Sequence, residues 1–257
     1  MHDFSLGGTE RIALRLAGEW ARLGRDVTIF CGNPLGPLHQ LVPTNVHLAF
    51  PDKAIARGWR SRHRLGVWAA TECRDRQIAG LFVPGNFHFA ALPALRARTG
   101  RSVVIVCKLS NPVRRPDRGA AAQFAADWKM ARNLSKANAA VAMSPALAEE
   151  TLQTFGGLPI TMIEEPILGC RSEAQRPPTD ARRGIIAAGR FTHQKDFALA
   201  LRTVAKLTDE TARLTILGDG LLKDNVGELG ARGESFGIAF PPRPPGDRHV
   251  LVPCVGH

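Results

Sequence analysis

Two cationic residues flank a short loop in the C-terminal half of the chain. Arg190 and Lys195 lie between the apolar run Ile185–Ala188, which is predicted to be a buried strand, and a helical pattern that begins near Asp196. Open α/β sheets bind ligands at the carboxyl ends of their strands, where the free N–H groups of a helix N-terminus also attract anions. The pattern predicts a phosphate or diphosphate site on Arg190 and Lys195, with two ordinary solvated surface charges as the alternative.

The elements around this loop follow an α/β alternation. After it the sequence predicts helix Asp196–Leu207, strand Arg213–Leu217, a tight turn at Gly218-Asp219-Gly220 and helix Leu221–Ala231. As a bare turn, Gly218-Asp219-Gly220 says little by itself about function.

Near the start of the chain, Gly7 and Gly8 precede another helical pattern. Thr9 is predicted to cap this helix and Gly24 to end it. The apolar residues Ile12, Leu16, Trp20 and Leu23 are predicted to share one face. Strand Val27–Cys31 follows, so this is the back half of a βαβ unit whose first strand should precede Gly7. We therefore expect that strand to be short or missing, and the true start to lie upstream.

The middle of the chain continues the alternation. A short apolar run at Leu81–Pro84 leads through Gly85–His88 to a helix over Phe89–Arg98. Val103–Cys107 is apolar throughout, as expected of a strand buried on both faces. Further predicted elements are helix Ala120–Ala137, strand Ala139–Met143, helix Ala146–Phe155 capped by Ser144, and strand Ile160–Ile163. The loop Lys108–Arg118 is predicted to form a cationic rim, with Asn111, Arg114, Arg115 and Arg118.

A change in composition predicts the domain organisation. The stretch Cys170–Arg183 is polar, rich in proline and arginine, and without period, which is typical of a linker. We predict an N-terminal domain over 1–168, a linker over 169–184, a partial C-terminal domain over 185–240, and a disordered or aberrant tail over 241–257. The chain is thus expected to be truncated at both ends.

Composition limits the functional classes. With 44% hydrophobic and 22% charged residues, the chain is typical of a globular protein. The net charge is +11, but the basic residues are spread along the chain and no nucleic-acid-binding module is recognisable, so we expect no nucleic acid partner. Arginine-rich genomic composition and peripheral contact with an acidic membrane both remain explanations. Five scattered cysteines without a C-x-x-C pair favour a reducing cytoplasm and argue against a zinc site.

Four motifs in order carry a family resemblance. Gly7-Gly8-Thr9-Glu10-Arg11, Ser144-Pro145-Ala146-Leu147, Gly189-Arg190 with Lys195, and Gly218-Asp219-Gly220 resemble the ordered signatures of glycosyltransferase family 4. The resemblance covers about residues 5 to 240. It implies a GT-B-like α/β fold, with two Rossmann-like domains built on parallel sheets. The acceptor would lie mainly on the N-terminal domain and the nucleotide-sugar donor on the C-terminal one.

The resemblance also implies roles for individual residues. Arg190 and Lys195 would bind the donor diphosphate, because paired cations stabilise the charge that grows on a leaving nucleoside diphosphate. Gly7 and Gly8 would lie near the donor phosphates or the transferred sugar, where absent side chains permit close approach. A simple turn before a helix is the alternative. Gly218, Asp219 and Gly220 would lie near the nucleotide, and no metal or other cofactor is implied.

Several positions depart from the family pattern. The usual E-x7-E pair of the C-terminal domain is absent, because the last glutamates, Glu228 and Glu234, have the wrong spacing. Where many members carry a histidine after the strand matching Val103–Cys107, this chain has Lys108. His88 could approach the cleft, although a lone histidine is more often structural. Lys108 and His88 are therefore weak catalytic candidates.

The leading hypothesis is a cytoplasmic glycosyltransferase, or a fragment of one, that contacts the inner membrane face peripherally. It would transfer a sugar from a nucleotide sugar to a cell-envelope glycan or lipid-linked acceptor. The alternative is a non-catalytic remnant that retains at most nucleotide binding. A nicotinamide-dependent oxidoreductase is disfavoured, because neither glycine cluster supplies G-x-G-x-x-G.

Overall fold

The structure is a computed structural model that describes residues 1–114, 118–164, 185–189, 191–192, 195–206, 214–218 and 222. The chain divides into two compact units, Met1–Ile167 and Leu168–His257. Both units are of the α/β type, and every strand pairing among the described residues is parallel. The Arg190, Asp219 and Gly220 positions, the predicted linker 169–184, helix Leu221–Ala231 and the tail 241–257 lie outside the described residues, apart from Leu222.

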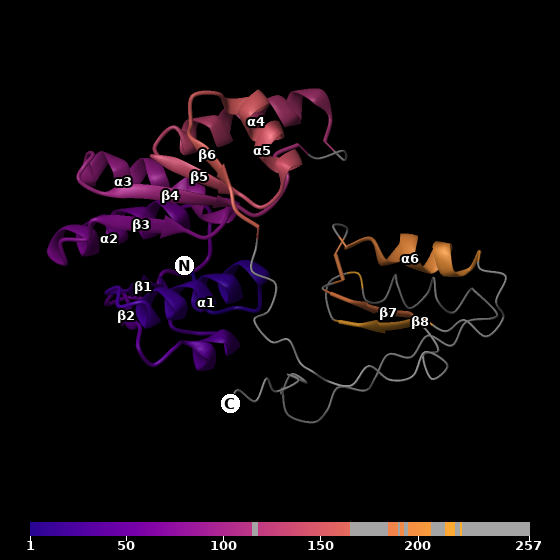
Figure 1. Ribbon diagram of the computed structural model, residues 1–257, viewed down its shortest axis with the longest axis horizontal. Coiled ribbons are helices and arrows are strands. Elements are labelled where there is room, and N and C mark those ends of the chain that lie inside the picture. Colours follow the sequence, from indigo (N-terminus) through magenta and orange to yellow (C-terminus); the bar gives the residue numbers. More distant parts are fainter. Residues whose placement is uncertain are drawn as a thin grey trace. The chain divides into compact units, whose positions relative to one another are not determined.

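The first unit is built on a four-stranded parallel sheet. Its order is β3-β4-β5-β6, and Figure 1 shows these strands side by side. Their bounds are Gly80–Val83, Val104–Leu109, Ala139–Ala142 and Ile160–Met162. A separate parallel pair joins β1 (Thr28–Phe30) to β2 (His47–Ala49). The carboxyl ends of the strands within each sheet therefore point the same way, which is the arrangement that gathers loop residues into a site.

Five α-helices and two 3₁₀ helices are present among the described residues of this unit. The α-helices are α1 (Gly8–Arg22), α2 (Ser61–Asp75), α3 (Leu92–Thr99), α4 (Ala120–Leu134) and α5 (Pro145–Phe155). The 3₁₀ helices are η1 (Pro37–Leu41) and η2 (Asn86–Ala91). Ser144 caps α5 as predicted, since its side chain accepts a hydrogen bond of 3.2 Å from the Leu147 N–H.

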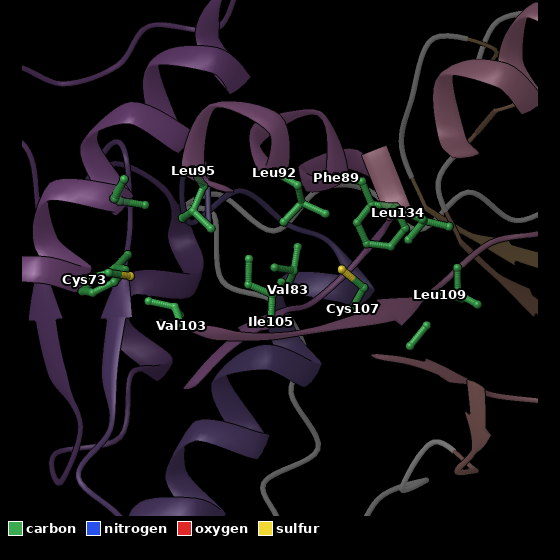
Figure 2. Packing of buried hydrophobic residues seen from close by; sticks show 14 of the residues in the cluster. Cys73, Val83, Phe89, Leu92, Leu95, Val103, Ile105, Cys107, Leu109 and Leu134 are labelled. Carbon is green, nitrogen blue, oxygen red and sulfur yellow. The ribbon is translucent and has the colours of Figure 1, made fainter. Parts of the chain in front are cut away.

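One hydrophobic core joins the sheet to the helices on one of its faces. In Figure 2, Leu92, Leu95 and Phe89 point from α3 and η2 toward Ile105 and Cys107 of β4. All of these side chains are buried. A second cluster lies around α1 and β1, and Trp20 of α1 packs edge-on against Phe82 of β3 at 5.2 Å. These two cores fix the strand ends, and so the loops that follow them.

The second unit has a smaller described core. Strands β7 (Ile185–Ala188) and β8 (Leu214–Leu217) pair in parallel, and helix α6 (Phe197–Val204) follows β7. Phe191 and Phe197 pack edge-on at 5.1 Å, together with buried Leu214 and Ile216. The loop that carries Lys195 is therefore attached to the core of this unit at both ends.

Several predicted elements need correction. Gly7, not Thr9, occupies the N-cap of α1, and no side chain caps this helix. Lys108 lies inside β4 and is buried, so it does not belong to a solvated rim. Leu23, which was predicted to share one face of the first helix with Ile12, Leu16 and Trp20, is 65% exposed, whereas Leu14 is buried. Helix α4 ends at Leu134, before the predicted Ala137.

Besides the 3₁₀ helix η1, one helix and one strand were not predicted. They are helix α2 and strand β2, and the sequence predicts no helix or strand at these positions. No strand precedes α1 among the described residues; residues 1–4 instead lie against the end of β1, where the Gly32 N–H donates to the Met1 carbonyl. No helix in the described part of the chain is long and apolar enough to cross a bilayer.

Candidate functional site

Three loops of the first unit meet at the carboxyl ends of its strands. A Cβ atom on Gly85, after β3, would lie 2.7 Å from Thr9 Cγ2 and 2.8 Å from Ser110 Oγ. The Asn86 side chain joins the loops after β3 and β4, because its Oδ1 accepts from the Ser110 N–H at 2.9 Å and its Nδ2 donates to the Asn111 carbonyl at 3.1 Å. The start of α1 is thus held beside both loops, as a ligand site at this edge requires.

Gly7 and Gly8 differ in what surrounds them. A Cβ on Gly7 would lie 2.0 Å from a carboxylate oxygen of Glu10, which folds back over this residue. A Cβ on Gly8 would meet no atom within 4 Å, and Gly8 is exposed at the first position of α1. Packing within the protein therefore does not demand a glycine at position 8. Approach of a ligand to the helix N-terminus is one reason to keep that position free of a side chain.

The two weak catalytic candidates are both buried. Lys108 is 5% exposed, in β4, and has an interaction partner in the structure. His88, in η2, is 4% exposed, and neither of its ring nitrogens has a hydrogen-bond partner. Burial lowers the pKa of His88 to about 3, with smaller contributions in the same direction from the Met1 amino group, His2 and Arg57. His88 is therefore neutral at physiological pH.

A charged cluster lies next to His88, and the sequence did not reveal it. Arg57 donates from Nε to Asp3 Oδ2 at 2.6 Å and from Nη2 to Asp3 Oδ1 at 2.7 Å. Burial alone would raise the pKa of Asp3, but hydrogen bonds from Arg57 and Ser5 outweigh it and hold that pKa below its ordinary value. Asp3 also lies 3.2 Å from His2 Nδ1, while His2 Nε2 is buried without a partner. This ion pair fixes the guanidinium group of Arg57 against the start of the chain.

Phe87 forms the exposed boundary of the same cluster. The guanidinium of Arg57 lies 5.5 Å from the centre of its ring and that of Arg62 lies 4.8 Å away. His2 and His88 contact the ring edge-on, with centroid distances of 6.3 and 5.3 Å. These residues come from three places distant in the sequence: the chain start, residues 57–62 around the start of α2, and η2.

The predicted cationic rim is only partly described. Arg115 lies outside the described residues. Arg114 is held through its backbone, since its N–H donates to Glu150 Oε1 at 2.7 Å, and its side chain is exposed. Among the described residues, no three His, Cys, Asp or Glu side chains are grouped so that they could hold a metal ion.

In the second unit, the structure describes one of the two predicted phosphate-binding cations. Lys195 is exposed just ahead of α6, and its N–H donates to the Thr192 carbonyl at 3.0 Å. Asp196 caps α6, because its side chain accepts from the Leu199 N–H at 3.1 Å. Lys195 therefore lies at a helix N-terminus, as predicted, while the placement of Arg190 beside it stays a prediction.

The ends of β7 and β8 approach each other closely. The Gly189 N–H donates to the Leu217 carbonyl at 2.9 Å, and a Cβ on Gly218 would lie 1.9 Å from the Gly189 carbonyl oxygen. Any side chain at position 218 would force these two backbones apart. Gly218, which follows β8, is therefore directly beside Gly189, which follows β7.

Comparison with known families gives one match. The profile of Glycosyltransferase Family 4 matches residues 6–167, which is more than half of the chain. No curated protein sequence is significantly similar to the chain.

Solved structures of glycosyltransferases resemble this one at low sequence identity. Anabaena Alr3699/HepE, in complex with UDP and glucose, gives a TM-score of 0.65 at 12% identity, with 92% of this chain and 67% of that chain covered. A point mutant of S. aureus TarM, in complex with Fondaparinux, alpha-GlcNAc-glycerol and UDP, gives 0.54 at 12% identity, with 68% and 35% covered. A glycosyltransferase from Rickettsia africae gives 0.58 at 13% identity, with 93% and 68% covered. The chain thus spans about a third of TarM and two thirds of the other two, and the comparisons confirm the predicted GT-B-like α/β fold.

Proposed function

Because this chain belongs to glycosyltransferase family 4, we propose that it transfers a sugar from a nucleoside-diphosphate donor to a cell-envelope glycan or lipid-linked acceptor. The family match over residues 6–167 carries this proposal. The open space at Gly8, on a helix N-terminus beside two strand-end loops, supports it from the geometry. UDP in the HepE and TarM structures is consistent with a nucleotide-sugar donor.

We assign the donor diphosphate to Arg190 and Lys195. The position of Lys195 ahead of α6 supports this role, because the helix N-terminus adds N–H donors to its positive charge. Gly7 and Gly8 are assigned to the transferred sugar or the donor phosphates, and Gly218, Asp219 and Gly220 to the nucleotide. In this scheme cationic side chains, rather than a metal ion, stabilise the leaving diphosphate.

His88 and Lys108 remain the candidates for a direct role in the transfer step. Neither is solvated, so each would act only on a group that enters the strand-end site. His88, neutral because of its low pKa, would donate or accept a hydrogen bond rather than carry charge. We place the enzyme in the cytoplasm, with its acceptor supplied at the inner face of the membrane.

A non-catalytic remnant is the second candidate. The observation that favours it is the spacing of Glu228 and Glu234, which do not form the E-x7-E pair that is usual in the family. Such a remnant would bind a nucleotide without transferring sugar from any donor.

Substitution of both cations tests the donor assignment. Arg190→Ala with Lys195→Ala should weaken binding of the preferred nucleoside diphosphate by at least about 30-fold, because two charge-assisted contacts are lost. The nucleotide is first identified by the rise in melting temperature across uridine, guanosine and adenosine diphosphates. Calorimetric titration then compares the variant with the parent chain.

The matched control changes two other cations of the same unit. Arg202→Ala with Lys206→Ala removes the same charge from exposed positions at the other end of α6. Equal affinity in all three proteins would refute the donor assignment. Nucleotide binding with no sugar transfer would instead favour the remnant.

A further inference from the structure

Two arginines converge on one exposed aromatic ring in the first unit. Phe87 is 43% exposed, and the guanidinium groups of Arg57 and Arg62 lie within 5.5 Å of its ring centre. Guanidinium groups stack on aromatic faces, which holds their planes in place. The ring therefore presents two positive charges at one spot on the surface. Asp3 pairs with Arg57, whereas Arg62 has no ion pair in the described structure.

Arg57 is fixed before any ligand arrives. Its Nε and Nη2 atoms are both engaged by Asp3, and Nη2 also donates to Ser5 Oγ at 3.1 Å. Asp3 is itself buried, so it cannot follow the arginine into solvent. Nη1 has no hydrogen-bond partner among the described residues and is left for an external acceptor. Little side-chain entropy remains to be lost when such an acceptor binds.

Arg62 is held by stacking on Phe87 rather than by an ion pair, and its N–H groups are also available to an external acceptor. It lies in the first turn of α2, where the helix has no acidic residue and Arg60 and Arg64 are its neighbours. In the described structure its side chain stacks on Phe87 and makes no hydrogen bond or ion pair. A helix N-terminus favours negative charge, so this accumulation of arginines is unfavourable without an anion nearby.

Buried polar atoms without partners lie against the same ring. His2 is 2% exposed and His88 is 4% exposed, and three of their four ring nitrogens have no hydrogen-bond partner. Both rings contact Phe87 edge-on. Orphaned buried nitrogens are uncommon in folded proteins and indicate a group that is satisfied by something else. The cluster thus combines two fixed cations at the surface with unused hydrogen-bonding capacity behind them.

We propose that Arg57, Arg62 and Phe87 form a binding site for a phosphate group of the sugar acceptor. The two guanidinium groups would bind its oxygens, and the imidazoles behind Phe87 would bind a neighbouring hydroxyl group. This assignment rests on the proposed function, in which the first unit receives the acceptor. It specifies the acceptor class: a sugar phosphate or a phosphate-bearing lipid rather than a neutral glycan.

Arg62→Gln is the test, because Arg62 has no structural ion pair to lose. Calorimetric titration of the full chain with glucose 1-phosphate should show about ten-fold weaker binding in this variant, as expected for the loss of one charge-assisted contact. The proposed donor site of the second unit should also bind phosphate. The measured quantity is therefore the difference in affinity between the parent chain and Arg62→Gln. Phe87→Leu, which removes the platform but no charge, should weaken binding in the same way.

Arg74→Gln is the matched control. Arg74 is exposed on the last turn of the same helix α2, so its removal changes the net charge equally. Vesicles of phosphatidylcholine with and without phosphatidylglycerol form a second arm. Arg62-dependent binding to the anionic vesicles identifies a lipid phosphate, and Arg62-dependent binding to glucose 1-phosphate alone identifies a soluble one.

The outcomes separate this inference from the proposed function. Equal effects of Arg62→Gln and Arg74→Gln in both arms would overturn the phosphate site, even if the chain transfers sugar. Arg62-dependent phosphate binding without sugar transfer from any donor would preserve the site and count against the enzyme.

Discussion

At the scale of single residues, the burial of His88 is unfavourable for folding. Both ring nitrogens are buried without partners, and burial lowers the pKa of His88 from 6.5 to about 3. Its charged neighbours are the Met1 amino group, Arg57 and Asp3, and His2 lies close by. An imidazole kept neutral and unsatisfied is more easily explained by a ligand than by stability.

His88→Leu should therefore stabilise the fold while impairing acceptor binding. At pH 7.5 we expect the free energy of unfolding to rise by about 1–3 kcal/mol, since two unsatisfied polar atoms are removed. The gain should widen as the pH falls. Below 6.5 the unfolded chain binds a proton at His88 and the folded chain does not, which costs the parent protein up to about 1.4 kcal/mol for each pH unit.

Urea unfolding at pH 7.5 and pH 5 measures this difference. His47→Leu is the control, because the side chain of His47 is 75% exposed. Its substitution should not appreciably change the free energy of unfolding at either pH. If His88→Leu is destabilising at both pH values, then the imidazole makes a structural contribution and the ligand explanation is wrong.

His88 can be recognised from the sequence as a candidate site residue, whereas its neighbours Asp3 and Arg57 cannot. His88 stood out because it follows a predicted strand, and strand ends are where sites form. Asp3 and Arg57 are separated by 54 positions, and their pairing depends on how β1 and α2 pack rather than on any local period. Residues that meet only through tertiary packing leave no spacing to recognise.

At the scale of elements, the packing of α2 against η2 depends on one glycine. Gly66 lies within α2, and a Cβ there would be 2.2 Å from the Ala91 carbonyl oxygen. The contact is with backbone, so it cannot be relieved by rotation of a side chain. The same packing sets the distance between Arg62, one turn earlier, and Phe87 of η2.

Gly66→Ala should destabilise the protein although alanine is the better helix former. Helix propensity alone predicts a gain of about 1 kcal/mol, but overpacking against a fixed carbonyl should cost about 3 kcal/mol, so that we expect a net loss of about 2 kcal/mol. Thermal unfolding followed by circular dichroism measures the net change. Gly8→Ala is the control, since a Cβ at the start of α1 meets nothing within 4 Å. A higher melting temperature for Gly66→Ala would show that α2 can move away from η2.

Strands buried within the sheet could be predicted from the sequence more accurately than short or arginine-rich elements. The apolar strands β4 and β5 were predicted close to their true positions, because continuous apolar runs mark strands buried within a parallel sheet. Strand β2 is only three residues long, and α2 combines arginines with small residues, so neither has a strong period. Lys108 was placed in a loop because a charged residue normally ends an apolar run. Only the tertiary structure shows that Lys108 is buried within β4.

At the scale of the whole molecule, each unit has a hydrophobic core of its own. In the first unit, two successive residues of β1 belong to different clusters: Phe30 packs with the main core and Ile29 with the cluster around α1. Among the described residues, the core cluster of the second unit draws on that unit alone. Domains with separate cores fold independently in most cases.

The fragment 1–167 should therefore fold alone and divide the two proposed binding activities. We expect a single cooperative unfolding transition and Arg62-dependent binding of glucose 1-phosphate with the affinity of the full chain. Nucleoside diphosphate binding should be lost, because Arg190 and Lys195 are absent from the fragment. Urea unfolding and paired calorimetric titrations measure both properties. If the folded fragment binds the nucleotide as tightly as the full chain does, the donor phosphates contact the first unit alone, and the glycines at the start of α1 become their principal site.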